Sequence, residues 1–290
     1  MIDMHIHTIY SDGLHSAQNI LKKANKLNLS LISITDHNST KVYDEILKND
    51  LLKLYSGSLV TGAELKCHIG EEIIELLVYD FNIDKMEQFI KNNYSSWHSI
   101  NKSMTTEFEN ILIKEKITYD KQLMRTHDFT KYNGIMELYK TVLQDRNNED
   151  KLGKELYKSI PEFFRKCVCN YKSRFYVDLT KYYPSVEDVV NFSRKHDCKV
   201  FMPHVFLFNN GLDILNNIQN TYKIDGVECF HPSYTLQECN ELLDYCKKHN
   251  LYTSAGSDYH GNGYELGSTS KFYSSNNIKL CDFKNILKRK

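Results

Sequence analysis

The chain has 290 residues, of which 41% are hydrophobic and four are proline, and its 37 basic residues balance its 37 acidic ones. This composition argues against a disordered chain, and the neutral total charge favours neither a nucleic-acid coat nor a membrane-surface protein. The length allows one large α/β domain, or a domain that carries an insertion.

The eight cysteines contain no Cys-x-x-Cys pair and show no regular spacing. We expect reduced thiols in a cytoplasmic protein. The first predicted strand starts at residue 2, and no apolar run approaches the length of a membrane span. We therefore expect no leader peptide, no membrane contact and no obligate protein partner.

The first fourteen residues predict a buried strand that leads into a loop with metal-ligating side chains. His5 and His7 alternate with apolar residues, so both imidazoles leave the same face of the strand. Asp12 follows in a Ser-Asp-Gly turn. A lone His-x-His pattern is often a chance pair on a surface strand, but with Asp12 it forms half of a metal cage that needs partners from elsewhere.

Helices and strands then alternate, and titratable side chains recur where the strands end. The periodicity predicts helices over residues 16–27 and 41–54, and strands over 31–37, 59–65 and 72–79. His37 and Glu64 end two of these strands, and Glu75 lies inside a third, where an unpaired carboxylate would be costly. This pattern is typical of an α/β barrel or a parallel sheet, in which the chemistry collects at the carboxyl ends of the strands.

A helical insertion is predicted over residues 85–175, between barrel segments 1–84 and 176–290. Strand patterns disappear there, and the clearest helices are residues 97–114 and 131–143. The insertion holds 17 lysine and arginine residues against 12 acidic ones. A basic segment of this kind suits contact with anions.

The alternation resumes in the second barrel segment. We expect strands over residues 199–205, 225–231 and 251–260, and helices over 185–196, 236–249 and 281–288. His204, Asp258 and His260 lie at or near strand ends. Glu228 lies inside a strand, and His231 is expected to be a core histidine bonded to the backbone.

Nine candidate ligands share a position at or near a predicted strand end. They are His5, His7, Asp12, His37, Glu64, Glu75, His204, Asp258 and His260. Nitrogen and oxygen ligands without cysteine suit Mn²⁺, Fe²⁺ or Zn²⁺ at a catalytic site, with Mg²⁺ also possible, and not a closed structural zinc site. Nine ligands are too many for one ion, so a site with two or three divalent ions is expected.

The chain resembles the PHP (polymerase and histidinol phosphatase) domain family in the order and spacing of six motifs. These are His5-x-His7, Ser11-Asp12-Gly13, Thr35-Asp36-His37, Gly62-Ala63-Glu64, Pro203-His204 and Gly256-Ser257-Asp258-Tyr259-His260. The resemblance implies a distorted (β/α)₇ TIM-like barrel with up to three metals at the carboxyl ends of its strands. The most similar subfamily has a helical insertion and includes 3′,5′-nucleoside bisphosphate phosphatases and a 5′-to-3′ exoribonuclease.

The resemblance also implies how the ligands are shared. One metal would be surrounded by His5, His7, Glu64 and Asp258. Glu64 would bridge to a second metal held by His204, and a third would be held by Asp12, His37 and His260. One position departs from the relatives, because Glu75 stands where they have a histidine. Glu75 either ligates through oxygen, which favours a harder cation such as Mn²⁺, or leaves the second site altered.

Three residues of the insertion are candidates for contact with a substrate phosphate. Arg125-Thr126-His127 resembles an Arg-Pro-His stretch of the relatives, which implies such a contact, and Lys102 is a further candidate. The alternative is that Arg125 and Lys102 are solvated surface charges and that His127 caps a helix.

The expected function is metal-dependent hydrolysis of a phosphate ester by a metal-bound hydroxide near Glu64. The substrate would be a nucleotide or a short 5′-phosphorylated oligonucleotide. Asp258 or His204 would manage the proton of the leaving group, so the catalytic candidates are Glu64, His204 and Asp258. Two alternatives remain: a histidinol-phosphate phosphatase, and a non-catalytic metal-binding regulatory module.

Overall fold

The computed structural model describes residues 1–130, 132–208 and 210–287. The chain forms two compact units, each with its own contacts. The barrel unit comprises Met1–Cys67, Ile74–Asn92 and Ser185–Lys290, and the insertion unit comprises His68–Ile73 and Asn93–Pro184.

Seven strands form the wall of the barrel unit, in the order in which they occur in the chain. They are β1 (Ile2–Asp3), β2 (Leu31–Ile34), β3 (Ser58–Ile69), β4 (Glu72–Tyr79), β5 (Lys199–Met202), β6 (Gly226–Phe230) and β7 (Tyr252–Ala255). Strands β1, β2 and β3 pair in parallel, as do β5, β6 and β7, whereas β4 runs antiparallel to β5. The first and last strands are joined where Ile6 bridges to Tyr259 and the N–H of Met4 donates to the carbonyl of Ala255 at 2.9 Å. The wall is therefore a nearly closed barrel.

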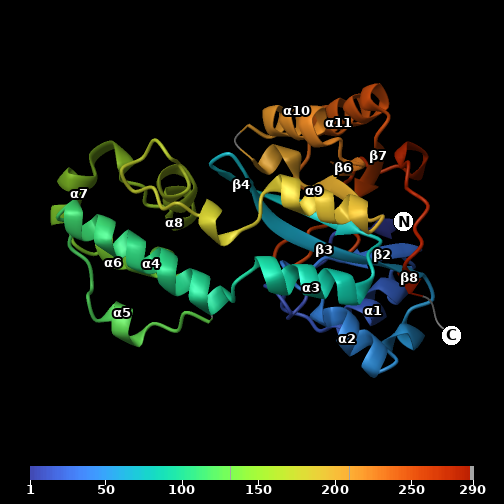
Figure 1. The fold of residues 1–290 in the computed structure, drawn as a ribbon, viewed down its shortest axis with the longest axis horizontal. Coiled ribbons are helices and arrows are strands. Elements are labelled where there is room, and N and C mark those ends of the chain that lie inside the picture. Colours follow the sequence, from blue (N-terminus) through green and yellow to red (C-terminus); the bar gives the residue numbers. More distant parts are fainter. Residues whose placement is uncertain (131, 209, 288–290) are drawn as a thin grey trace. The chain divides into compact units, whose positions relative to one another are not determined.

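Helices flank the strands of the barrel unit on two sides (Figure 1). On one side lie α1 (Ala17–Lys26), α2 (Lys41–Lys48) and α3 (Ile83–Asn93), and on the other α9 (Val186–Lys195), α10 (Gly211–Tyr222) and α11 (Leu236–His249). Local sequence explains where several of them begin. Ser16 caps α1, and α9 and α11 each start with a capping box, built from Ser185 and Asp188 and from Thr235 and Glu238.

The insertion unit is helical and has its own apolar core. Its helices are α4 (Trp97–Lys114), α5 (Leu123–Thr126), α6 (Gly134–Val142), α7 (Asn147–Leu152) and α8 (Ile160–Phe163). The rings of Tyr139 and Phe163 stack with their centroids 3.6 Å apart, and Phe108 and Phe175 each pack edge-on against Phe163. The predicted helix over 131–143 begins at Gly134, and Lys131 lies outside the described residues.

The predicted α/β fold, a distorted TIM-like barrel with a helical insertion, is confirmed, but the predicted helix over 281–288 is wrong. Residues 281–285 are not helical, and β8 (Ile286–Leu287) pairs antiparallel with β3. Residue 288 lies outside the described residues. The short apolar run in this tail fits either a helix or a strand, and the free edge of β3 decided between them. No described helix combines the length and apolarity needed to cross a bilayer.

Candidate metal centre

The strand ends of the barrel unit bring the predicted ligands together in three overlapping groups. The first contains His5, His7, Glu64 and Asp258; the second contains His37, Glu64 and Glu75; the third contains His7, Asp12, His37 and His260. His204, the ninth candidate, contacts the two carboxylates of the second group. All nine predicted ligands therefore lie in one region, although they come from β3, β4 and the segments that follow β1, β2, β5 and β7.

The first group has the spacing of a coordination shell. Oε2 of Glu64 lies 3.1 Å from Nε2 of His5 and 3.2 Å from Nε2 of His7. Oδ1 of Asp258 lies 3.4 Å and 3.3 Å from the same two nitrogens. Ligands bound about 2.0–2.2 Å from one ion are separated from each other by about 2.9–3.5 Å. These four atoms therefore surround a point at which a divalent ion fits.

Unsatisfied polar atoms in the described part of the chain cluster in the first and second ligand groups. Nε2 of His5, Nε2 of His7, Nδ1 of His37 and Oε2 of Glu64 are buried and have no hydrogen-bond partner. Buried polar atoms in native proteins almost always have one, because losing hydration without compensation is costly. Metal ions bound in the first and second groups would satisfy these four atoms, so the residues present fit such ions.

Glu64 also organises the second group. Its Oε1 lies 2.9 Å from Nε2 of His204, and its Oε2 lies 3.2 Å from Nδ1 of His37. Glu75 completes the group, with one oxygen 3.8 Å from Nδ1 of His37 and the other 3.5 Å from Nε2 of His204. A carboxylate placed in this way between two imidazole sets is able to bridge two ions.

Asp12 is the centre of the third group and its most exposed member. Its carboxylate lies 3.2 Å from Nε2 of His260, 3.5 Å from Nε2 of His37 and 3.6 Å from Nδ1 of His7. The close approach of the Ser-Asp-Gly turn requires glycine, because a Cβ at Gly13 would come within 2.5 Å of the carbonyl oxygen of His7. The turn thus holds Asp12 against the imidazoles.

The electrostatics of the centre reflect this crowding of opposite charges. Burial would lower the pKa of His5, but Glu64, Glu228 and Asp258 together raise it well above its usual value. Burial would raise the pKa of Glu64, but His5, His37 and His204 hold it well below its usual range. The imidazole of His5 therefore retains a proton at neutral pH unless a metal replaces it.

The match to known proteins decides the family. The sequence profile of the PHP domain matches residues 3–182, more than half of the chain. The chain belongs to the PHP domain family.

Two solved structures have the fold of this PHP domain protein. One is described as a metal-dependent phosphoesterase from Bifidobacterium adolescentis, with 22% identity, a TM-score of 0.60, and coverage of 92% of this chain and 91% of the other. The second is an amidohydrolase from Chromobacterium violaceum with bound sulfate and no metal, with 18% identity, a TM-score of 0.63, and coverage of 100% and 98%. No curated protein matches the sequence at a significant level.

A buried carboxylate that was not predicted as part of the site supports two of the candidate ligands of this PHP domain. Glu228 accepts a hydrogen bond from the backbone N–H of His204 at 2.9 Å, and its other oxygen lies 3.1 Å from Nδ1 of His5. A Cβ at Gly256 would come within 2.3 Å of both Glu228 and His5, so only glycine fits there. The sequence carried one signal for this role, namely an acidic residue inside an apolar strand.

Two other buried aspartates hold the loops that carry candidate ligands. Asp36 accepts hydrogen bonds from the N–H and hydroxyl of Thr8 at 2.7 and 2.6 Å and from the hydroxyl of Ser11 at 2.6 Å. Asp3 accepts hydrogen bonds from the N–H and hydroxyl of Ser257 at 2.9 and 2.6 Å. The loops before Asp12 and Asp258 are therefore tied to the barrel wall.

His231 is buried and bonded to the backbone, as expected, but it also faces the site. Its Nδ1 accepts a hydrogen bond from the N–H of Ser233 at 3.2 Å, and its Nε2 lies 3.8 Å from Oδ2 of Asp258. Because the backbone N–H occupies Nδ1, the neutral ring carries its proton on Nε2.

The three candidate phosphate contacts lie in the insertion unit. Arg125 is exposed in the short helix α5, and Lys102 is exposed on α4. His127 ends α5, and its Nε2 donates to the carbonyl of Tyr132 at 2.9 Å while its ring packs edge-on against Phe129. Arg125 and Lys102 therefore lie at the surface of this unit, where a dissolved ligand can reach them.

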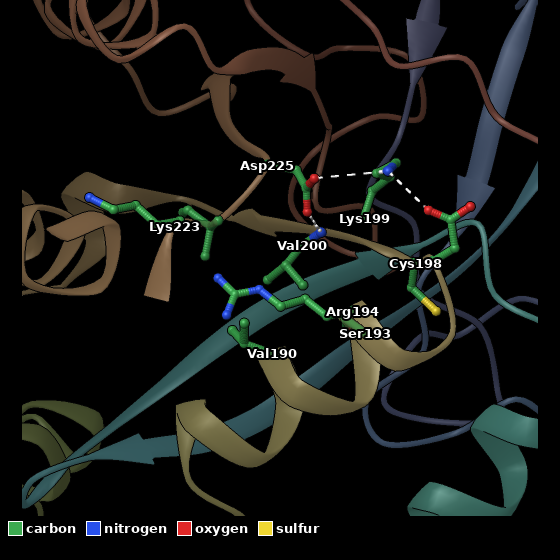
Figure 2. A pocket seen from close by; sticks show the side chains of 10 residues that line it. Val190, Ser193, Arg194, Cys198, Lys199, Val200, Lys223 and Asp225 are labelled. Atoms are coloured by element: carbon green, nitrogen blue, oxygen red, sulfur yellow. Dashed lines mark hydrogen bonds and ion pairs between the residues drawn. The ribbon is translucent and has the colours of Figure 1, made fainter. Parts of the chain in front are cut away.

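A surface pocket of about 200 Å³ shares no lining residue with the metal centre. Figure 2 shows the side chains that line it. It lies at the amino ends of β5 and β6, whereas His204 follows the carboxyl end of β5. Asp225 accepts a hydrogen bond from the N–H of Val200 at 2.9 Å and pairs with Lys199 at 4.0 Å. Among the described residues that line this pocket, none belongs to the ligand groups.

Proposed function

We propose that this PHP domain protein is a metal-dependent phosphoesterase that hydrolyses nucleotides or short 5′-phosphorylated oligonucleotides. The observation that carries the proposal is the approach of Nε2 of His5, Nε2 of His7 and Nδ1 of His37 to within 3.2 Å of one oxygen of Glu64. Membership of the PHP family supports the same chemistry.

We propose that the centre holds two or three divalent ions, with Mn²⁺, Fe²⁺ or Zn²⁺ as the best candidates and Mg²⁺ as a further one. Such ions lower the pKa of water towards about 7 and neutralise phosphoryl oxygens when bound. The ligands are nitrogen and oxygen atoms without cysteine, which suits these metals. Glu64 belongs to two of the ligand groups and would hold two ions together.

Residues around the ligands would orient the substrate and move its protons. His204 and Asp258 both contact Glu64 or the histidines that surround it, and both have a positive φ, of 28° and 50°. We assign to Asp258 or His204 the transfer of a proton to the leaving group. Glu64 is the third proposed catalytic residue. Arg125, His127 and Lys102 would bind the phosphates of a nucleotide or oligonucleotide.

We place this activity in the cytoplasm. Eight cysteines without a Cys-x-x-Cys pair or a regular framework are typical of proteins that keep their thiols reduced. Cell fractionation with an antibody against the chain tests this placement.

The activity is tested by comparing three substrates with protein loaded with Mn²⁺, Fe²⁺ or Zn²⁺. Adenosine 3′,5′-bisphosphate and 5′-phosphorylated RNA should be hydrolysed, and a chelator should abolish the reaction. Preferential turnover of histidinol phosphate would favour a histidinol-phosphate phosphatase. Stoichiometric metal without turnover of any ester would favour a regulatory metal-binding module and refute the proposed function.

A further inference from the structure

Lys66 is a lysine on the same strand face as the central carboxylate of the metal centre. It follows Glu64 by two residues on β3, and alternate residues of a strand point to the same side. The N–H of Lys66 donates to Oδ1 of Asn38 at 2.9 Å, and the N–H of Asn38 donates to the carbonyl of Glu64 at 2.9 Å. The backbone of Lys66 is thereby fixed against the loop that carries His37.

The ammonium group of Lys66 lies beside Glu75. Its Nζ is 3.6 Å from Oε1 of Glu75, and the same oxygen is 3.8 Å from Nδ1 of His37. Glu75 is therefore shared between a lysine and the imidazoles of the second ligand group. An ion held by that group would also attract Glu75 and would weaken the pairing of this carboxylate with the lysine.

Lys66 is also accessible to a solute, unlike the ligands at the base of the centre. Its side chain is 32% exposed and that of Glu75 is 21% exposed, whereas His5 is completely buried. A lysine ammonium group offers three donors and a compact positive charge. A positive group at the edge of a metal centre is suited to bind a phosphoryl oxygen whose negative charge the metals do not neutralise.

We propose that Lys66 contacts the substrate, with its ammonium group bound to a non-bridging phosphoryl oxygen while a metal ion engages Glu75. This inference rests on the proposed phosphoesterase function and adds a phosphate-binding residue from the barrel unit. The competing view is that Lys66 only balances the charge of Glu75. The two views differ in what happens to metal content and to phosphate affinity when the lysine is replaced.

The test compares Lys66→Met, Lys66→Gln and Lys66→Arg in the full chain loaded with Mn²⁺. Metal content is measured by elemental analysis, and binding of inorganic phosphate is measured by calorimetry. The two neutral variants should retain the metal content of the wild type but bind phosphate about 10- to 100-fold more weakly, as expected for loss of one charged hydrogen bond. Lys66→Arg should recover most of that affinity. Lys195→Met, at the exposed end of α9, is the matched control and should change nothing.

Two results would overturn the inference. Unchanged phosphate affinity in both neutral variants would show that Lys66 makes no phosphate contact. Loss of metal from both neutral variants, with the metal retained in Lys66→Arg, would show that the lysine only compensates Glu75. A wild-type protein that binds phosphate through Lys66 but hydrolyses no ester would instead refute the proposed function and leave this inference standing.

Discussion

Glu228 lies directly behind His5, with its Oε1 3.1 Å from Nδ1 of the ring, while Nε2 of the same ring lies 3.1 Å from Glu64. Both carboxylates are buried, so water does not weaken either contact. A carboxylate that holds the far nitrogen of an imidazole fixes the orientation of the ring and raises its basicity as a ligand. The second oxygen of Glu228 holds the backbone of His204, so one side chain from β6 positions two predicted ligands.

Glu228→Gln should therefore weaken metal binding about 10- to 100-fold, because the neutral amide is a poorer partner for the ring of His5. Competition with a chelating dye measures the affinity. Glu241→Gln, on the exposed side of α11, is the control and should bind as the wild type does. Equal affinities for the two variants would show that Glu228 has no part in orienting His5.

His7→Ala should abolish hydrolysis and reduce metal content while leaving the helical circular dichroism largely intact. The reason is that the ring contacts Glu64 and Asp258 through one nitrogen and approaches Asp12 with the other. His249→Ala, at the end of α11, serves as the control. An unchanged kcat would remove His7 from the ligand set.

The protein treated with a chelator should lose stability as the pH rises from 7 to 10. Burial would lower the pKa of His7, but hydrogen bonds with Asp258 and Glu64 raise it from 6.5 to about 10. Because the pKa of His7 is higher in the folded state than in the unfolded state, its protonation stabilises the folded state. This contribution is fully present below about pH 6.5 and is lost as the pH rises through about 10. Melting temperatures across this range measure the effect, and His7→Ala should show a flatter profile. A melting temperature independent of pH would contradict it.

Metal binding should release protons over the same pH range, because only a neutral imidazole ligates. An indicator dye in weakly buffered solution at pH 7 measures the release during titration with Zn²⁺. The apparent affinity should increase towards pH 10. Metal binding without proton release would mean that the imidazoles are already neutral.

Glu75→His should shift the metal preference of the centre from Mn²⁺ towards Zn²⁺. A carboxylate oxygen suits the harder cation, whereas an imidazole suits Zn²⁺ better. The variant and the wild type are each incubated with equal amounts of the two metals, desalted and analysed for metal content. The same Mn²⁺ to Zn²⁺ ratio in both proteins would exclude Glu75 from the coordination shell.

Arg125→Ala should mainly raise KM or lower kcat/KM for phosphorylated substrates, since a guanidinium group binds phosphate through two hydrogen bonds. Metal content should stay the same. Arg165→Ala, elsewhere in the insertion unit, provides a comparison. An effect no larger than that of Arg165→Ala would leave Arg125 as a surface charge.

Local sequence predicted most of the barrel because each signal spans only a few residues. A short run rich in β-branched and apolar residues that ends in histidine or a carboxylate indicates a buried strand without reference to its partners, as in the segment from Leu31 to His37. The tail was predicted wrongly because the pairing of Ile286 with Val60 joins segments more than 200 residues apart. Glu228 was recognised only as an acid inside a strand, since its partner His5 is equally remote.

The sequence by itself determined which side chains stand at the strand ends, because strand period and turn chemistry are local properties of the chain. Only the tertiary structure decided which atoms face each other. Closure of the barrel, where Ile6 meets Tyr259, brings Asp258 to within 3.4 Å of His5. That distance depends on the curvature of the whole sheet and on every strand between its first and last members, which no short stretch of sequence encodes.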